Sequence, residues 1–172
     1  VSRYPELLAL SWVNAQRVIK ATHVAPSAPL GMQRVVGQTL EEGETNGSFD
    51  TAQVLQQPVY SKPMAYNPNA YSFILQVPLI EQGQMRGTIM AEFSLDGLMR
   101  YGIPPEIAAR YALALQDDQQ NILAGHLPML DALYRWVPCT RQPLEYSVMV
   151  APIGNGLVLK HASNVPQCGF CI

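Results

Sequence analysis

The residues that decide the fold run from Ala70 to Ser94 and read AYSFILQVPLI, EQGQ, MRGTIMAEFS. The first block is apolar and rich in β-branched and aromatic residues, which is typical of a β-strand. Glu81 to Gln84 is polar and contains a glycine, so it predicts a turn. The third block then returns as the antiparallel partner of the first. The sequence therefore predicts a long β-hairpin over residues 70–94.

A second hairpin is predicted near the start of the chain. Residues 7–13, LLALSWV, form a nearly continuous apolar run of the kind that suits a strand covered on both faces. Trp12 in this run is expected to belong to the core. Asn14 to Gln16 can turn the chain, and residues 17–24, RVIKATHV, contain several β-branched residues and predict the return strand.

The segment between the two hairpins is predicted to be mostly loop, with one helix. Residues 37–48 hold several glycines among polar residues, which predicts a surface loop. Ser48 or Asp50 can cap a helix that runs to Gln56. Residues 59–64, VYSKPM, predict a short strand whose internal proline places it at an edge or at an irregularity.

A second, smaller unit is predicted after residue 105. Residues 111–124 predict a strand, a polar turn and a return strand. Residues 144–152 and 157–161 predict a last hairpin, whose Gly-Asn-Gly tip at 154–156 tolerates the positive φ of a tight turn. We therefore expect an α+β protein of two units, in which the second unit packs on the first because it is too small to bury a core alone.

The composition excludes several classes of protein. Of the 172 residues, 48% are hydrophobic and 14% are charged. A charged share below the usual ~25% favours a well-buried sheet protein over a disordered segment. The formal net charge is −2 and the basic residues are scattered, so we expect no nucleic-acid partner. No apolar run approaches the roughly 18 residues of a membrane span. Since the chain has no initiator methionine, we interpret it as a fragment of a longer protein.

Motifs for catalysis and metal binding are weak. Cys168 and Cys171 form a CxxC pair, but only one residue follows it, so a redox-active helix cannot begin there. A zinc site would need two more ligands, for which His161 and Cys139 are candidates, at a spacing that matches no finger pattern. The sequence has no glycine-rich phosphate loop and no HExxH motif. We expect no catalytic residue, no metal and no cofactor.

Several of these stretches together resemble one family. Residues 4–13, YPELLALSWV, resemble the opening of the extracytoplasmic domain of many proteobacterial sensor histidine kinases, including the C4-dicarboxylate sensor type. Residues 77–95, with VPLI, Gly87 and FSL, resemble the hairpin that closes the first PAS-like unit of such domains. Residues 109–125 resemble the start of the second unit, and residues 145–159 resemble its final hairpin.

The resemblance covers residues 4–162 and implies a PAS-like (Cache, or PDC) architecture, an antiparallel sheet with covering helices followed by a smaller second unit. It implies a membrane-distal sensor unit at residues 1–98, a membrane-proximal unit at 99–162 and a tail at 163–172, either disordered or foreign to the natural chain. Such a domain binds a small molecule, with a carboxylate as one candidate, and transmits the signal across the membrane to a histidine kinase. The fragment itself is then not an enzyme.

The resemblance also implies flanking membrane spans, a homodimeric parent receptor and a periplasmic location at the inner membrane. Other functions stay open. Chemoreceptors and cyclic-dinucleotide synthases carry similar ectodomains, and only the sequence downstream distinguishes these outputs. A small redox or metal-binding protein that uses the terminal cysteines is the remaining alternative.

The candidate ligand site is drawn from residues 60–73. Residues 60–63, YSKP, lie where domains of this family enter their ligand-side strand, and Lys62 is a cation in an aromatic neighbourhood. A cation and hydroxyl groups that converge in a pocket would suit a carboxylate ligand. We expect the pocket between the sheet of residues 70–94 and a covering segment of residues 30–62. The alternative is that Lys62 faces solvent on an edge strand. The expected lining is Tyr60, Ser61, Lys62, Tyr71 and Phe73.

Overall fold

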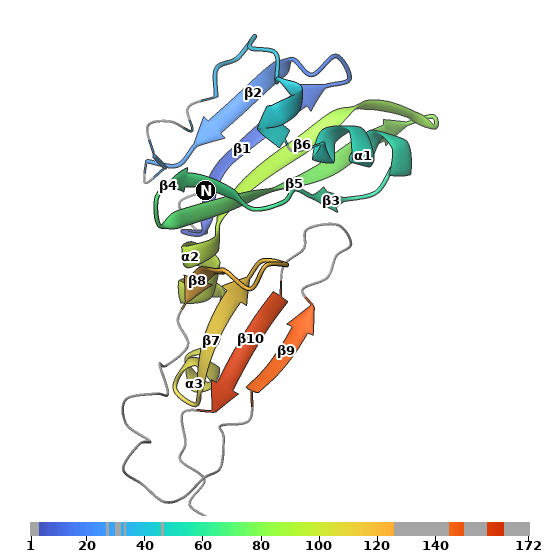
Figure 1. Cartoon of the computed structure of the whole chain (residues 1–172). Coiled ribbons are helices and arrows are strands. Elements are labelled where there is room, and N and C mark those ends of the chain that lie inside the picture. The colour runs from blue at the N-terminus through green and yellow to red at the C-terminus, as the bar shows by residue number, and fades with distance from the viewer. Residues whose placement is uncertain are drawn as a thin grey trace, which may run out of the picture.

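The computed structural model describes residues 4–26, 28–29, 32, 34–45, 47–125, 145–149 and 158–163. These residues form two antiparallel β-sheets, one of six strands and one of four. Figure 1 shows the smaller sheet below the larger one, with the short helix α2 between them. The predicted α+β class is confirmed.

The larger sheet is built on the predicted long hairpin. Its strands are β1 (Leu7–Asn14), β2 (Ile19–Val24), β3 (Val59–Tyr60), β4 (Met64–Asn67), β5 (Ala70–Glu81) and β6 (Gln84–Ser94). They are ordered β2-β1-β6-β5-β3, and β4 also pairs with β5. The turn between β5 and β6 has two residues, Gln82 and Gly83, with φ of 52° and 75°. Such a turn needs positive φ at both positions, which Gly83 adopts without steric cost.

A helical junction leads to the smaller sheet. It consists of α2 (Leu95–Gly97), the π-helix η3 (Leu98–Gly102) and α3 (Pro105–Ala108). The smaller sheet contains β7 (Tyr111–Gln116), β8 (Ile122–Gly125), β9 (Glu145–Met149) and β10 (Val158–Ser163), ordered β8-β7-β10-β9. Both sheets share one topology, because the first strand of each lies between the second strand and the last. The predicted tip at 154–156, the three cysteines and residues 164–172 lie outside the described residues.

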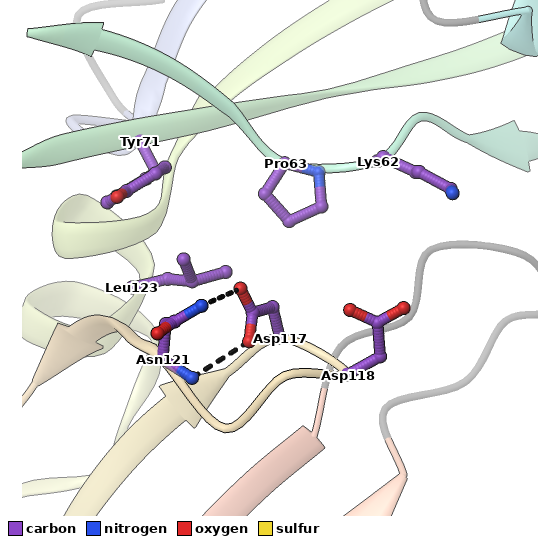
Figure 2. Close-up of a pocket in the computed structure, with 7 residues that line it drawn as sticks. All are labelled: Lys62, Pro63, Tyr71, Asp117, Asp118, Asn121 and Leu123. Carbon is purple, nitrogen blue, oxygen red and sulfur yellow. Dashed lines mark hydrogen bonds between the residues drawn. The ribbon is translucent and has the colours of Figure 1, made fainter.

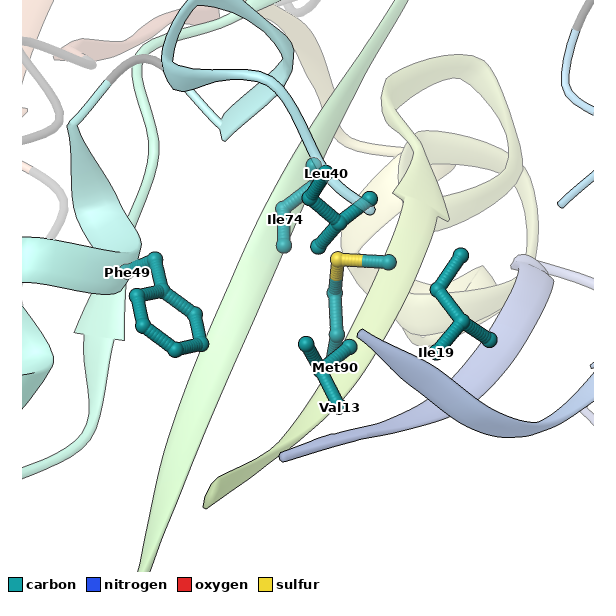
Figure 3. Close-up of a cluster of buried hydrophobic side chains, with 6 residues drawn as sticks. All are labelled: Val13, Ile19, Leu40, Phe49, Ile74 and Met90. Atoms are coloured by element: carbon teal, nitrogen blue, oxygen red, sulfur yellow. The ribbon is translucent and has the colours of Figure 1, made fainter. Parts of the chain in front are cut away.

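The described residues between β2 and β3, which we call the covering segment, lie over one face of the larger sheet. They include the short helix η2 (Glu42–Thr45) and helix α1 (Ser48–Leu55). Helix α1 was predicted, but neither expected cap is present. It begins after Gly47, with no side-chain cap, and Ser48 donates its hydroxyl to the Thr45 carbonyl. Figure 3 shows the core formed between this segment and the sheet. Its members are Val13, Ile19, Leu40, Phe49, Ile74 and Met90.

Two strand predictions are wrong in detail. From Ala9 onward, strand β1 is covered on one face only, because Leu10 is 38% exposed and Trp12 is 44% exposed on the other. Trp12 is therefore not a core residue. Residues 59–64 do not form one strand either, since β3 ends at Tyr60 and β4 begins at Met64. Pro63 lies in the gap and has no N–H to donate to a neighbouring strand.

Candidate ligand-binding site

The covered face of the larger sheet is unusually polar for a buried surface. Side chains alternate along a strand, so the residues of β5 and β6 in phase with the core residues Ile74 and Met90 point toward the covering segment. Four of these are polar and at most 3% exposed. They are Ser72, Gln76, Thr88 and Glu92.

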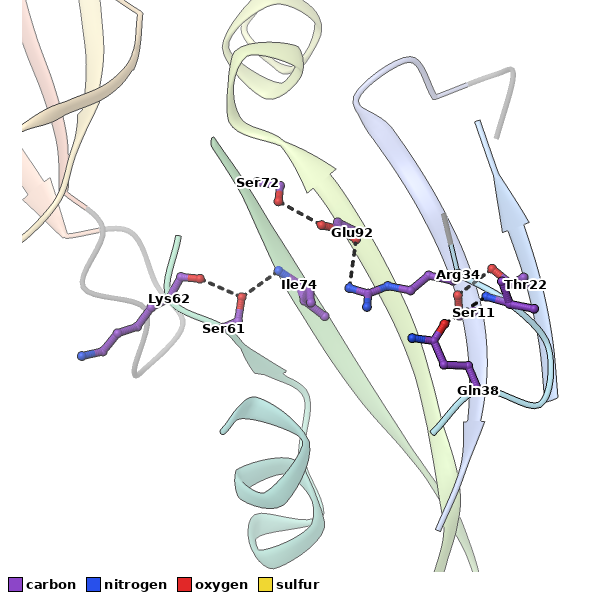
Figure 4. Close-up of polar contacts among 10 residues, drawn as sticks. Ser11, Thr22, Arg34, Gln38, Ser61, Lys62, Ser72, Ile74 and Glu92 are labelled. Carbon is purple, nitrogen blue, oxygen red and sulfur yellow. Dashed lines mark hydrogen bonds and ion pairs between the residues drawn. The ribbon is translucent and has the colours of Figure 1, made fainter. Parts of the chain in front are cut away.

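Glu92 is the charged member of this face. The Ser72 hydroxyl donates to its Oε1 at 3.0 Å, and Nη2 of Arg34 lies 3.7 Å from its Oε2. Figure 4 shows Arg34 reaching from the covering segment to Glu92 on β6. Burial raises the pKa of Glu92 above its ordinary value, and Arg34 and Ser72 offset only part of that effect.

Two buried atoms of this face lack a hydrogen-bond partner among the described residues. They are Oε2 of Glu92 and Nε2 of Gln76. The other end of the Gln76 amide is paired, because Thr88 Oγ1 donates to Oε1 at 2.8 Å. A buried polar atom without a partner costs about 1–3 kcal/mol, and such atoms are rare in native proteins. The face therefore presents one acceptor and one donor to whatever enters it.

The covering segment is held in place by contacts with β2 and with the turn between β1 and β2. Arg17, in the turn between β1 and β2, forms an ion pair with Asp50 of α1, and its guanidinium lies 5.4 Å from the centre of the Phe49 ring. Closer to Arg34 along the chain, the Gly37 N–H donates to the Ile19 carbonyl of β2 at 2.8 Å. Arg34 thus approaches Glu92 from a segment that is anchored to the sheet.

The aromatic residues of the predicted site lie on the opposite face. Tyr71 and Phe73 share a face as predicted, but that face packs on the smaller sheet. The rings of Tyr60 and Phe73 are 5.3 Å apart, and Phe73 stacks on Phe93 at 5.5 Å. The expected position beneath the covering segment is therefore wrong for these three residues. The odd positions of β5 face away from it, and Tyr60 of β3 pairs with one of them, Leu75. Their part in ligand binding stays a prediction.

Ser61 and Lys62 also differ from the expected arrangement. Ser61 is buried, and its hydroxyl accepts from the Ile74 N–H and donates to the Lys62 carbonyl, so it serves the backbone. Lys62 is exposed and borders a pocket of about 360 Å³ between the sheets, not within the first unit. Figure 2 shows Lys62 and Pro63 facing the β7–β8 turn across this pocket. The lining is Lys62, Pro63, Tyr71, Asp117, Asp118, Asn121 and Leu123.

The charges around this pocket disfavour an anionic ligand. Asp117 and Asp118 face the space that Lys62 borders, so their carboxylates would repel a carboxylate ligand. A hydrogen bond from Asn121 holds the pKa of Asp117 below its ordinary value. Asp117 also accepts the backbone N–H groups of Gln119 and Asn121, which makes it a turn-forming residue.

Sequence reasoning missed Arg34, Ser72, Gln76 and Glu92. The signal for three of them was present, because they stand in phase with Ile74 or Met90 in the most apolar strands of the chain. A polar residue at such a position is buried by its neighbours. Arg34 lies outside any strand or helix, so no periodicity could have assigned it to this face.

Comparison with known proteins identifies solved structures of similar fold. No family model and no curated protein sequence matches the chain. Among solved structures, the extracellular domain of mmHK1S-Z3, which is inferred to be a histidine kinase, matches at a TM-score of 0.53 and 10% identity, over 96% of this chain and 75% of that one. The chemoreceptor domain Tlp3 of Campylobacter jejuni matches at 0.50 and 11% identity, over 95% of this chain and 69% of that one. The chain has the fold of an extracellular sensor domain.

A third sensor-fold structure is the extracellular ligand-binding receptor of Desulfohalobium retbaense. It matches at a TM-score of 0.53 and 14% identity, over 91% of this chain but only 30% of that one. At the level of the fold, the resemblance to PAS-like sensor domains is confirmed. Within the described part of the chain, no helix has the length and apolar character to span a membrane. Likewise, no three acidic, histidine or cysteine side chains gather there in a metal-binding arrangement.

Proposed function

We propose that this chain is the extracytoplasmic ligand-sensing domain of a membrane-bound sensor histidine kinase in a two-component system. The observation that carries the proposal is the covered face of the larger sheet, where Glu92 and Gln76 bury polar atoms without partners. A small polar molecule that entered this face would satisfy both atoms and offset their desolvation. The similar extracellular domains of receptors support the same role.

The proposal also covers the parent receptor to which this domain would belong. Flanking membrane spans would anchor the domain outside the inner membrane, and a homodimeric parent would pass the signal to its cytoplasmic kinase. A ligand transmits a signal only if it binds two receptor states with different affinity. The closure of the covering segment over Glu92 is the candidate difference, because Arg34 comes from that segment.

The ligand is proposed to be a small molecule that carries both donors and acceptors. A carboxylate group would accept from the Gln76 amide and pair with the Arg34 guanidinium, which is suited to planar anions. Lys62 was the expected cation for this role, and its pocket between the sheets is the competing location. The Tlp3 domain was solved in complex with 4-methylisoleucine, so amino acids are sensible first probes.

Thermal melting against a defined panel tests this function. The probes are L-serine, L-asparagine, 4-methylisoleucine, ethanolamine and succinate. A probe at 100 times its dissociation constant should add about 2.7 kcal/mol, which is roughly 5–11 °C for a chain of this size. The function is contradicted if none of these compounds, and no member of a broader metabolite library, shifts the melting temperature.

Matched variants locate the site. Gln76→Leu should abolish the shift, because it removes the unpartnered donor while keeping the volume similar. Lys62→Ala should keep the shift, because Lys62 is exposed and lies between the sheets. The opposite pattern would move the ligand to the pocket that Lys62, Tyr71 and Asp118 border.

A chemoreceptor is the second candidate for the parent protein. The specific observation in its favour is the similarity to the Tlp3 chemoreceptor domain, at a TM-score of 0.50. The domain would bind its ligand in the same way, and only the output would differ, as it would in a cyclic-dinucleotide synthase. The redox alternative rests on Cys168 and Cys171, which lie outside the described residues.

A further inference from the structure

The Glu92 carboxyl group lies in surroundings that satisfy neither of its protonation states completely. In the ionised state, Oε1 accepts the Ser72 hydroxyl, while Oε2 has no hydrogen bond within the described structure. The Arg34 guanidinium at 3.7 Å lies within ion-pair range of Oε2 but beyond hydrogen-bond distance. A donor that reached Oε2 would therefore favour the carboxylate over the acid.

The charged groups around Glu92 are few. Strand β5 faces it with uncharged Ser72 and Ile74, and β1 places Ala9 directly opposite it. From the described part of the covering segment, Arg34 is the charged group that acts on it. Asp50 of α1 is engaged with Arg17. The protonation of Glu92 is thus decided by burial, Arg34 and whatever occupies the face.

The effect of burial on the pKa of Glu92 outweighs that of Arg34, so this pKa is raised in the unliganded protein. A buried carboxyl with one open oxygen then holds its proton more tightly than an exposed glutamate does. An ammonium group placed against Oε2 would supply both an opposite charge and N–H donors. These two effects lower the affinity of the carboxyl for its proton.

We propose that Glu92 exchanges its proton for the ammonium group of the ligand, so that the domain reads ligand and pH together. The O–H bond of the Glu92 carboxyl breaks, the proton passes to the solvent buffer, and Oε2 accepts an N–H of the ammonium group. No other bond is made or broken. This inference rests on the proposed sensing function and specifies the ligand group that the buried carboxyl selects.

The exchange has a quantitative signature. Where Glu92 is protonated in the free protein, binding of one ammonium ligand releases about one proton. The association constant then rises ~tenfold per pH unit, and it levels off above the pKa of the free protein, because ligand and proton compete for one carboxyl. A ligand without an ammonium group shows no such release.

Isothermal calorimetry in buffers of different ionisation enthalpy measures the released proton. L-serine, L-asparagine and ethanolamine are the ammonium probes, and glycerate, which carries a hydroxyl group in place of the amine of serine, is the control, each at pH 5.5, 6 and 6.5 in citrate and in MES. We expect proton release with at least one ammonium probe, decreasing as pH rises. Glu92→Gln should abolish the release and weaken that probe at least tenfold.

The outcomes separate this inference from the proposed function. Binding of an ammonium probe without proton release, or equal binding by Glu92→Gln, overturns the exchange but leaves the sensing function standing. Binding of glycerate alone does the same. If no probe binds, both the exchange and its choice of ligand class are overturned, and only the broader melting library then decides the function.

A second variant tests the exchange independently if Glu92→Gln does not fold. Ser72→Ala removes the hydroxyl that donates to Oε1, so the ionised form loses support and the pH range of proton release should move upward. An unchanged range would show that the released proton does not come from Glu92, and would overturn the exchange.

Discussion

At the scale of single residues, the buried polar side chains of the covered face reduce the stability of the unliganded protein. Gln76 and Thr88 are fully buried and bond to each other, yet Nε2 of Gln76 has no partner among the described residues. Buried polar groups that a fold leaves incompletely paired are expected where binding requires them. Variants of this pair can therefore measure how much stability the unliganded protein loses by burying it.

A double-mutant cycle measures this cost. Thr88→Val should destabilise the protein by about 1–3 kcal/mol, because it leaves Oε1 of Gln76 buried without a donor. Adding Gln76→Leu should recover most of the loss, since both partners are then apolar. Urea unfolding of the parent, the two single variants and the double variant checks this. A double variant as unstable as the sum of the two single variants would contradict it.

The pH dependence of stability belongs to Glu92. Its pKa in the folded state is raised above the ordinary value of 4.5, so folding favours the protonated form. Its contribution to stability is therefore complete below about pH 4.5 and is lost as pH rises through the raised value. The free energy of unfolding of the parent, relative to Glu92→Gln, should fall over that range in chemical denaturation. A relative stability that rises with pH would contradict the direction of the shift.

At the scale of elements, close strand approach makes one glycine indispensable. Gly87 of β6 has a φ of 153°, and a Cβ there would lie 2.1 Å from the Val13 carbonyl oxygen on β1. Gly83 in the β5–β6 turn also has positive φ, but a Cβ there would meet nothing within 4 Å. The two positions separate steric exclusion from backbone strain alone.

Gly87→Ala and Gly83→Ala form a matched pair. Gly83→Ala should cost about 1–2 kcal/mol for the left-handed conformation. Gly87→Ala should cost clearly more, because β1 and β6 must also move apart at the centre of the larger sheet. Thermal denaturation followed by circular dichroism measures both. Equal losses in the two variants would show that β1 adjusts at no cost.

The elements also show which structural features could be predicted from the sequence. The hairpins were predictable because strand periodicity and turn residues act locally, as at Gln82 and Gly83. The face to which each side chain points was not predictable, since Phe73 and Ile74 are both apolar and either could have met the covering segment. Arg34 and the interruption at Pro63 depend on tertiary contacts that leave no periodic signal.

At the scale of the molecule, the two faces of the larger sheet pack against different parts of the protein. Ser72, Ile74 and Glu92 face the covering segment, while their chain neighbours Phe73 and Phe93 pack toward the smaller sheet. A displacement of β5 or β6 caused on one face therefore reaches the other through the same backbone. Leu95, Leu115 and Leu123 complete the apolar contact between the sheets.

Two phenylalanine truncations test this separation. Phe73 is 6% exposed and Phe49 is 1% exposed, on opposite faces of the larger sheet. Each change to alanine should cost about 3–5 kcal/mol. Hydrogen exchange should then increase mainly in β7 and β8 for Phe73→Ala, and mainly in α1 and β3 for Phe49→Ala. The same exchange pattern in both variants would mean that the two faces are not separate.

The shared strand order has a consequence for how the chain folds. Each sheet is completed by pairing its first strand with its last, β1 with β6 and β7 with β10. Contacts between strands so distant in sequence raise the contact order and place refolding in the range of about milliseconds to seconds. During synthesis, all strands of the larger sheet have left the ribosome once Ser94 has emerged. The smaller sheet must wait for β10, so β7 and β8 exist for a time with an unpaired edge.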